Sequence, residues 1–191
     1  LICILSTGLV ACKAKKLTIE LKDKQIESAI SGTEETAEFE ALFEFSGELD
    51  DKKKAKLEAI EEIVRADMDI DEFTITGDGS NTQVEIVGYI PISSNENLDT
   101  SWYMLVSKYV GKTHTVRFTT GRQYQDLKRK ISSVDSSFAP KEYHPTTIKF
   151  KAKSAEITVP AGYVDGKPRV MWSNTVDGRV VMRFADGIFD D

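Results

Sequence analysis

Residues 38–45, Glu-Phe-Glu-Ala-Leu-Phe-Glu-Phe, alternate charged and apolar side chains almost without interruption. Successive side chains of a strand point to opposite faces, so this period of two predicts a half-buried strand. One face carries Phe39, Ala41, Phe43 and Phe45, and the other carries glutamates with Leu42 among them. Such a strand requires a sheet with a core on its apolar side, and that requirement sets the fold class of the surrounding chain.

Further patterns on both sides of this strand predict two helices and more strands. Asp50 and Asp51 open a helix whose apolar face holds Leu57, Ile60, Ile63 and Val64. A second helix, with Thr120 as N-cap and Gln123 at the third helical position, carries Tyr124, Leu127, Ile131 and Val134 at helical spacing. Asp165-Gly166 and Asp177-Gly178 are tight-turn signals between strands. The other expected strands are residues 17–21, 73–76, 84–90, 102–106, 115–119, 147–151, 156–159, 169–173 and 179–184.

The predicted class is therefore α+β, an antiparallel or mixed sheet with two helices. It is arranged either as one sheet or as two similar halves, each a strand, a helix and further strands. We expect an acidic half over residues 37–100 and a basic half over residues 101–191.

The segment before these elements has the pattern of an export signal. Residues 1–8 are uncharged and mostly apolar, Leu9-Val10-Ala11-Cys12 follows, and Lys13, Lys15 and Lys16 come next. Leu9-Val10-Ala11-Cys12 resembles the lipobox of bacterial lipoproteins. That resemblance implies a signal peptide over residues 1–11, truncated at its N-terminus, and cleavage before Cys12, which would carry palmitate-type lipid. With Lys rather than Asp after the cysteine, it favours the outer membrane, facing the periplasm.

Three other interpretations of this segment are open. A transmembrane helix needs about 20 apolar residues, and the run from Leu1 to Ala11 is far shorter. An ordinary signal peptide would leave Cys12 unmodified, and a buried N-terminal strand would make Cys12 a core thiol. The only other cysteine, Cys3, would leave with the signal, so the mature chain would form no internal disulfide.

The length of the tether between Cys12 and the folded domain has two solutions within residues 12–36. If the short strand of residues 17–21 docks in the fold, the tether is residues 13–16, about 12 Å when extended. If it does not, the tether runs to Thr36 and reaches about 75 Å. The first holds the domain against the membrane, and the second lets it search the periplasm.

Charge is unevenly distributed along the chain, whose net charge is −6. Residues 17–100 hold 22 acidic and 7 basic residues, whereas residues 101–191 hold 9 acidic and 15 basic residues. This split indicates two units, or two faces that attract each other, and the basic half could meet an anionic envelope polymer or an envelope protein. Nucleic acid is not expected, because the chain is acidic and has no nucleic-acid-binding motif.

No catalytic, cofactor or metal motif is visible. The two histidines, His114 and His144, stand in no nucleophile or zinc pattern. Residues 67–71, Asp-Met-Asp-Ile-Asp, start like a calcium loop but have Glu72 where the turn needs Gly. Trp102, Tyr103 and Trp172 could stack on sugars but lie in apolar runs typical of a core, so we expect no catalytic, cofactor or metal site.

Lipid attachment at Cys12 is thus the one predicted site. The sequence favours a lipid-anchored cell-envelope protein with a binding or structural role and no catalysis. The alternative is an envelope enzyme that acts on peptidoglycan or lipid through an unrecognised carboxylate pair. A third hypothesis is a soluble module, if residues 1–12 are folded core.

Overall fold

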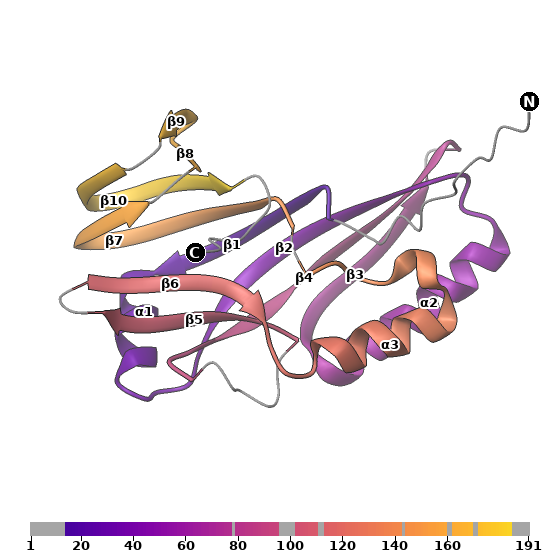
Figure 1. Cartoon of the computed structure of the whole chain (residues 1–191). Coiled ribbons are helices and arrows are strands. Elements are labelled where there is room, and N and C mark those ends of the chain that lie inside the picture. Colours follow the sequence, from indigo (N-terminus) through magenta and orange to yellow (C-terminus); the bar gives the residue numbers. More distant parts are fainter. Residues whose placement is uncertain are drawn as a thin grey trace, which may run out of the picture.

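A computed structural model describes residues 14–77, 79–95, 102–110, 113–142, 144–159, 162–169 and 172–184. Cys12 and the whole predicted signal lie outside the described residues. Figure 1 shows a large curled sheet with helices packed against one of its faces. The elements are β1 (Lys16–Lys22), α1 (Asp23–Ile30), β2 (Glu35–Ser46), α2 (Asp51–Asp67), β3 (Asp69–Gly77), β4 (Asn81–Ser93), β5 (Tyr103–Val110), β6 (Thr113–Thr120), α3 (Tyr124–Val134), the 3-10 turn η1 (Ser136–Phe138), β7 (Thr146–Val159), β8 (Gly162–Val164), β9 (Lys167–Arg169) and β10 (Trp172–Phe184).

All ten of these strands belong to one mixed sheet. Nine follow the order β6-β5-β4-β2-β1-β7-β10-β8-β9, and β3 pairs with β4. Most pairs are antiparallel, but β1 runs parallel to β7 and the end of β4 runs parallel to β5. Strands account for 56% of the structure.

The α+β expectation with two helices is therefore wrong, because the described residues are mostly β and contain three α-helices. The third helix, α1, lies in the stretch assigned to the tether. Its apolar positions are only Ile26, Ala29 and Ile30 in eight residues, too few for a visible helical period. The idea of two similar halves also fails, because β1 and the β4–β5 contact join strands from both halves into a single sheet.

The pattern at residues 38–45 is confirmed as β2, with Phe39 and Ala41 buried on its inner face, the face toward the helices. The two predicted helices are α2 and α3. The Asp50 side chain accepts a hydrogen bond from the backbone N–H of Lys53, as expected of an N-cap. The cap predicted at Thr120 is wrong, because Thr120 ends β6 and Gln123 occupies the N-cap of α3.

Near the C-terminus the structure has two long strands where the sequence predicted four short ones. β7 and β10 pair along their whole length, and Asp177-Gly178 lies inside β10 at a bulge, not in a turn. Gly178 has a φ of 108°, and Ser154 on the facing strand has a φ of 64°, so both strands bend where the register shifts. Asp165-Gly166 is confirmed as the turn between β8 and β9, with positive φ at both residues.

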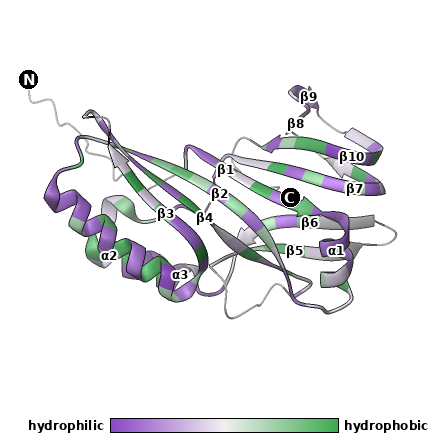
Figure 2. Ribbon diagram, turned by 180° about the vertical axis from the view of Figure 1, so that it is seen from behind, coloured by the Kyte–Doolittle hydropathy of each residue, from purple (hydrophilic) through white to green (hydrophobic). Residues whose placement is uncertain are grey.

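The core fills the inner face of the sheet in two connected parts. One part joins inner-face side chains of the central strands with Ile26 and Ala29 of α1. The other joins α2 and α3 with Val84 of β4 and with Trp102. Figure 2 shows hydrophobic and hydrophilic residues alternating along the strands of this sheet, as expected where one face is buried. Among the described helices, none is long and apolar enough to cross a membrane.

Candidate functional site

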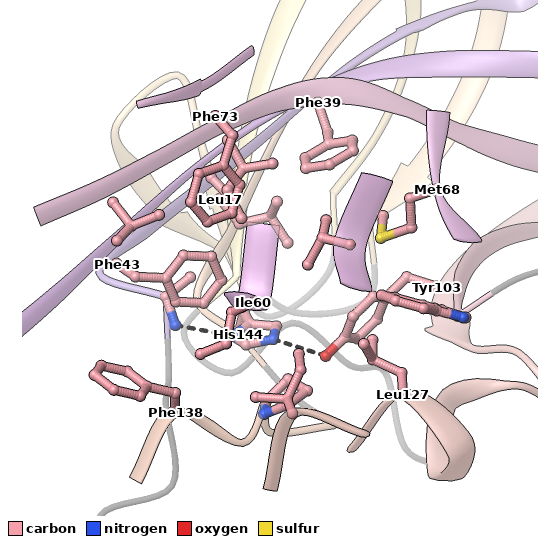
Figure 3. Close-up of a pocket in the computed structure, with 18 of the residues that line it drawn as sticks. Leu17, Phe39, Phe43, Ile60, Met68, Phe73, Tyr103, Leu127, Phe138 and His144 are labelled. Carbon is pink, nitrogen blue, oxygen red and sulfur yellow. Dashed lines mark hydrogen bonds between the residues drawn. The ribbon is translucent and has the colours of Figure 1, made fainter. Parts of the chain in front are cut away.

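An apolar cavity lies between the inner face of the sheet and the helix pair α2–α3. We call it the sheet–helix cavity; its volume is about 100 Å³. Strands, helices and the α3–β7 connection all contribute to its wall. Figure 3 shows the labelled side chains of these segments pointing into the cavity. The lining residues are Ala14, Leu17, Phe39, Ala41, Phe43, Phe45, Leu57, Ile60, Val64, Met68, Phe73, Val84, Ile86, Ile90, Trp102, Tyr103, Phe118, Leu127, Ile131, Phe138, Pro140 and His144.

The sheet side of the cavity is built by the strand pattern that defines β2. Phe39, Ala41, Phe43 and Phe45 follow one another at alternate positions and all line the cavity. Phe39 and Ala41 are buried, but Phe43 and Phe45 are only half-buried although they point inward. An inward aromatic side chain keeps accessible surface only if the space beside it is not filled by protein atoms. The second half of β2 therefore leaves its inward aromatic side chains incompletely covered.

The helix side of the cavity is a pair of helices joined by charged side chains. Leu57, Ile60 and Val64 of α2 and Leu127 and Ile131 of α3 line the cavity at helical spacing.

Two ion pairs connect these helices at opposite ends of their contact. Lys130 Nζ donates to Asp67 at 2.5 Å, and Lys56 Nζ donates to Asp135 at 2.5 Å. The Lys56 bond, together with the Ser137 hydroxyl and backbone N–H, lowers the pKa of Asp135 to about 2. Ion pairs at the two ends of the contact and apolar side chains beside the cavity therefore hold α2 and α3 together.

The polar edge of the cavity is a chain of hydrogen bonds through His144. The backbone N–H of Ala14 donates to His144 Nδ1 at 2.9 Å. Because Nδ1 accepts, the proton of the neutral ring is on Nε2, which lies 3.3 Å from the Tyr103 hydroxyl. That hydroxyl donates to the carbonyl of Lys141 at 2.7 Å. The contacts of His144 with Ala14 and Tyr103, drawn as dashed lines in Figure 3, connect the start of the described chain to the cavity wall.

A second hollow of about 190 Å³ adjoins the cavity and is more polar. Met68, Ile90, Trp102 and Tyr103 border both spaces. Asp67 and Asp69 line the second hollow, as does Tyr89. The charge of Asp71, which also accepts a hydrogen bond from the Tyr89 hydroxyl, raises the pKa of Tyr89. Of residues 67–71, Met68 lines the apolar cavity, whereas the three aspartates lie beside it.

The structure places the histidines, the tryptophans and the acidic segment singled out in the sequence in different parts of the protein. His144 is buried in the cavity wall, whereas the side chain of His114 is outside the described part. Trp102 is 2% exposed and lines the cavity, and Trp172 lies half-buried on β10. Residues 69–71 begin strand β3, and among the described residues no group of three or more acidic, His or Cys side chains could hold a metal ion.

The strand predicted at residues 17–21 docks in the fold. β1 lies in the middle of the sheet between β2 and β7, and the backbone N–H of Lys15 donates to the carbonyl of Leu42. Ala14 is 2% exposed and belongs to the cavity wall. Whether a tether joins Cys12 to this domain stays a prediction, and a lipid on Cys12 would correspond to the short alternative.

No protein-family model matches this chain, and no curated protein matches it. The sequence alone missed the cavity. Its visible signal in the sequence was the row of four apolar side chains of β2, three of them phenylalanines, which all line it.

Proposed function

We propose that this chain is a lipid-anchored cell-envelope protein that binds an alkyl chain in the sheet–helix cavity. The observation that carries the proposal is the lining of the cavity, in which every side chain is apolar except those of Tyr103 and His144 at one edge. Ligand sites are concave, mostly apolar spaces with a few placed polar groups, and this cavity has that composition.

Binding is favoured over catalysis by the same lining. No carboxylate lines the cavity, and the lone imidazole already uses Nδ1 to hold the Ala14 backbone. A general acid–base pair would need two groups in hydrogen-bond reach of a reacting atom. The two such groups at the cavity edge, Tyr103 and His144, contact each other and the backbone of Lys141 and Ala14, so the cavity is better suited to retain a ligand through burial of apolar surface and through shape.

The size of the cavity limits how much of a ligand it takes. A volume of about 100 Å³ corresponds to about three water molecules at their liquid volume, or to a segment of three or four alkyl carbons. Each buried CH₂ contributes about 0.8 kcal/mol, so the enclosed segment contributes roughly 2–3 kcal/mol. The rest of the chain would lie along half-exposed Phe43, Phe45 and Phe73, which gives weak binding and easy exchange.

The envelope location is proposed from the lipobox at Leu9-Val10-Ala11-Cys12, with the outer membrane, facing the periplasm, favoured by Lys13. Two chain units separate Cys12 from Ala14, a span of at most about 7 Å. A lipid on Cys12 would thus bring the cavity wall close to the bilayer, which is a source of alkyl chains. If palmitate labelling of cells survives Cys12→Ala, lipidation at this site is refuted, and a density gradient that places the protein in the inner membrane refutes the outer-membrane assignment.

Ligand binding can be tested with the tryptophan of the cavity wall. The chain has two tryptophans, so Trp172→Phe leaves Trp102 as the sole reporter. An eight-carbon alcohol with a terminal bromine is a suitable probe because it is uncharged and is not repelled by Asp67 and Asp69. We expect saturable quenching of Trp102 that the unbrominated alcohol reverses by competition. Quenching that rises linearly without saturation, equal to that of the urea-unfolded chain, would refute the proposal.

A further inference from the structure

The outer face of the sheet, away from the helices, is divided into an acidic and a basic region. Over β2 and β4 it carries Glu38, Glu40, Glu44 and Glu85. Over β7 and β10 it carries lysines and arginines instead. β1 lies between the two regions, and its Lys16 pairs with Glu40 while its Glu20 pairs with Lys149. The uneven charge of the sequence thus becomes two neighbouring regions of one surface.

The basic region is assembled by strand register. Lys151 lies opposite Arg179, and Arg183 lies opposite Thr147, so these side chains share the outer face with Lys149 and Lys153. The inner positions between them, such as Phe150 and Met182, are buried. Lys167 and Arg169 of β9 are exposed, but they lie opposite Val164 and Gly162 on the inner-face side and are not part of this surface. We call the outer surface the basic face, and its residues are Lys22, Lys149, Lys151, Lys153, Arg179 and Arg183.

Acidic side chains on the same surface only partly neutralise it. Glu20 accepts from Lys149 and lies 3.6 Å from Arg179, and these cations lower its pKa. Asp165 uses its carboxylate to accept the backbone N–H of Val181. Asp23 of α1 accepts the backbone N–H of Lys153, and the other acids of this region are Glu156 and Asp177. Six basic residues against these five acidic ones leave a small net positive charge on a protein of net charge −6.

An exposed aromatic residue lies at the edge of the basic face. Tyr163 of β8 is 49% exposed and is the single large hydrophobic residue in that state within the described ranges. It lies opposite Arg183 in the β8–β10 pair and opposite Pro168 in the β8–β9 hairpin. Tyrosine next to lysine and arginine is the combination found where proteins meet the head-group layer of a bilayer.

We propose that the basic face docks on anionic lipid head groups of the bilayer, a proposal that uses the envelope location proposed above but not the ligand cavity. Thr18, Thr147, Arg183 and Tyr163 form one row across four adjacent strands. At about 4.8 Å per strand, Tyr163 is roughly 14 Å from β1 along the sheet. Because β1 starts four residues after Cys12, an anchor there holds this row near the membrane surface.

The physical gain is a second membrane contact. Stable attachment normally combines a lipid with a basic patch, and each Lys or Arg at an anionic surface raises membrane partitioning about fivefold. At 0.1 M salt the Debye length is about 10 Å, so a vesicle responds mainly to the charges that lie directly against it. The docked face also fixes which side of the domain is turned toward the periplasm.

The test uses a lipid-free chain of residues 13–191, which keeps every described residue of both core clusters, the first of which is Ala14. It is sedimented with vesicles of phosphatidylethanolamine and phosphatidylglycerol (7:3) or of phosphatidylcholine alone. We expect binding to the anionic vesicles only, weakened by 0.5 M salt. Equal binding to both vesicle types, or none to the anionic vesicles, would overturn the proposal, and capture by isolated peptidoglycan in place of vesicles would assign the face to that polymer.

Matched charge variants locate the contact. Lys151→Gln/Lys153→Gln/Arg183→Gln removes three charges from the basic face, and Lys24→Gln/Lys52→Gln/Lys54→Gln removes three exposed charges from α1 and α2. We expect at least a tenfold loss of anionic-vesicle binding for the first variant and less than a threefold change for the second. Equal losses would overturn the assignment of the face. Quenching of Trp102 by the bromoalcohol should be unchanged in both, so failure of docking is distinguished from failure of ligand binding.

Discussion

Filling the sheet–helix cavity should stabilise the protein and block its ligand. Ala41 is the suitable position, because its side chain is on the inner face of β2 and borders the cavity. Ala41→Leu adds three carbon atoms, which is close to the three water volumes that the cavity of about 100 Å³ represents. Ala37 is the matched control, since it lies on the same face of the same strand, is 0% exposed and does not line the cavity.

The two substitutions should change the free energy of unfolding in opposite directions. At about 0.8 kcal/mol for each buried carbon, Ala41→Leu gains up to about 2.4 kcal/mol, and imperfect fit reduces this to about 1–2 kcal/mol. For a domain of this size, 1 kcal/mol shifts Tm by about 2–4 °C, so we expect a rise of roughly 2–8 °C. Ala37→Leu forces three carbons into filled space and should cost about 1–3 kcal/mol.

Thermal unfolding followed by circular dichroism measures both effects, and Trp102 quenching measures ligand binding in the same samples. The Ala41→Leu protein should be more stable and should lose saturable quenching by the bromoalcohol. The reasoning is refuted if Ala41→Leu destabilises the protein as much as Ala37→Leu does, because the space beside Ala41 would then be already filled.

Three further substitutions test the surroundings of the cavity. Asp135→Asn should lower stability by about 1 kcal/mol at pH 7, a figure reduced for solvent screening of the Lys56 pair. Because the pKa of Asp135 is lowered to about 2, this stabilisation is present above pH 4 and is mostly lost near pH 2, where melting curves of variant and parent should converge. Ser107→Ala should raise Tm by about 2–4 °C, since the buried Ser107 hydroxyl has no hydrogen-bond partner among the described residues; an unchanged or lower Tm contradicts this. His144→Leu should lower the urea midpoint by an amount equal to about 1–3 kcal/mol, because the buried N–H of Ala14 loses its acceptor, and an unchanged midpoint would mean that water replaces it.

Local patterns predicted the elements whose signal lies within a few residues. The alternation in β2 and the apolar spacing of α2 and α3 each identify an element and its buried face. Helix α1 was not predicted, because its eight residues form barely two turns and show no clear period. Its helical state depends on the packing of Ile26 and Ala29 against the sheet.

Partners far apart in sequence could not be predicted in the same way. Asp177-Gly178 has the composition of a hairpin turn, but pairing with Lys153 and Ala152 on β7 keeps it within a strand. The cavity is even harder to predict from the sequence. It exists because side chains of β2 and of the helix pair do not meet completely, which is a property of the spacing between layers and not of any one segment.

His144 shows why the position of a single residue in the fold is hard to predict from the sequence. In sequence it precedes Pro145 and belongs to no motif, so the expectation was a surface or hydrogen-bonding role with no particular partner. Its position in the cavity wall depends on Ala14, which is 130 residues away along the chain.

The central place of β1 in the sheet has a consequence for how the protein folds. β1 pairs with β2 at once, but its other neighbour, β7, is reached only after most of the chain is available, and Glu20 and Lys149 are 129 residues apart. Closing such a long loop makes parallel pairing slow. During folding the early strands would therefore wait with one side of β1 unpaired, and this edge stays open to wrong pairing until β7 arrives.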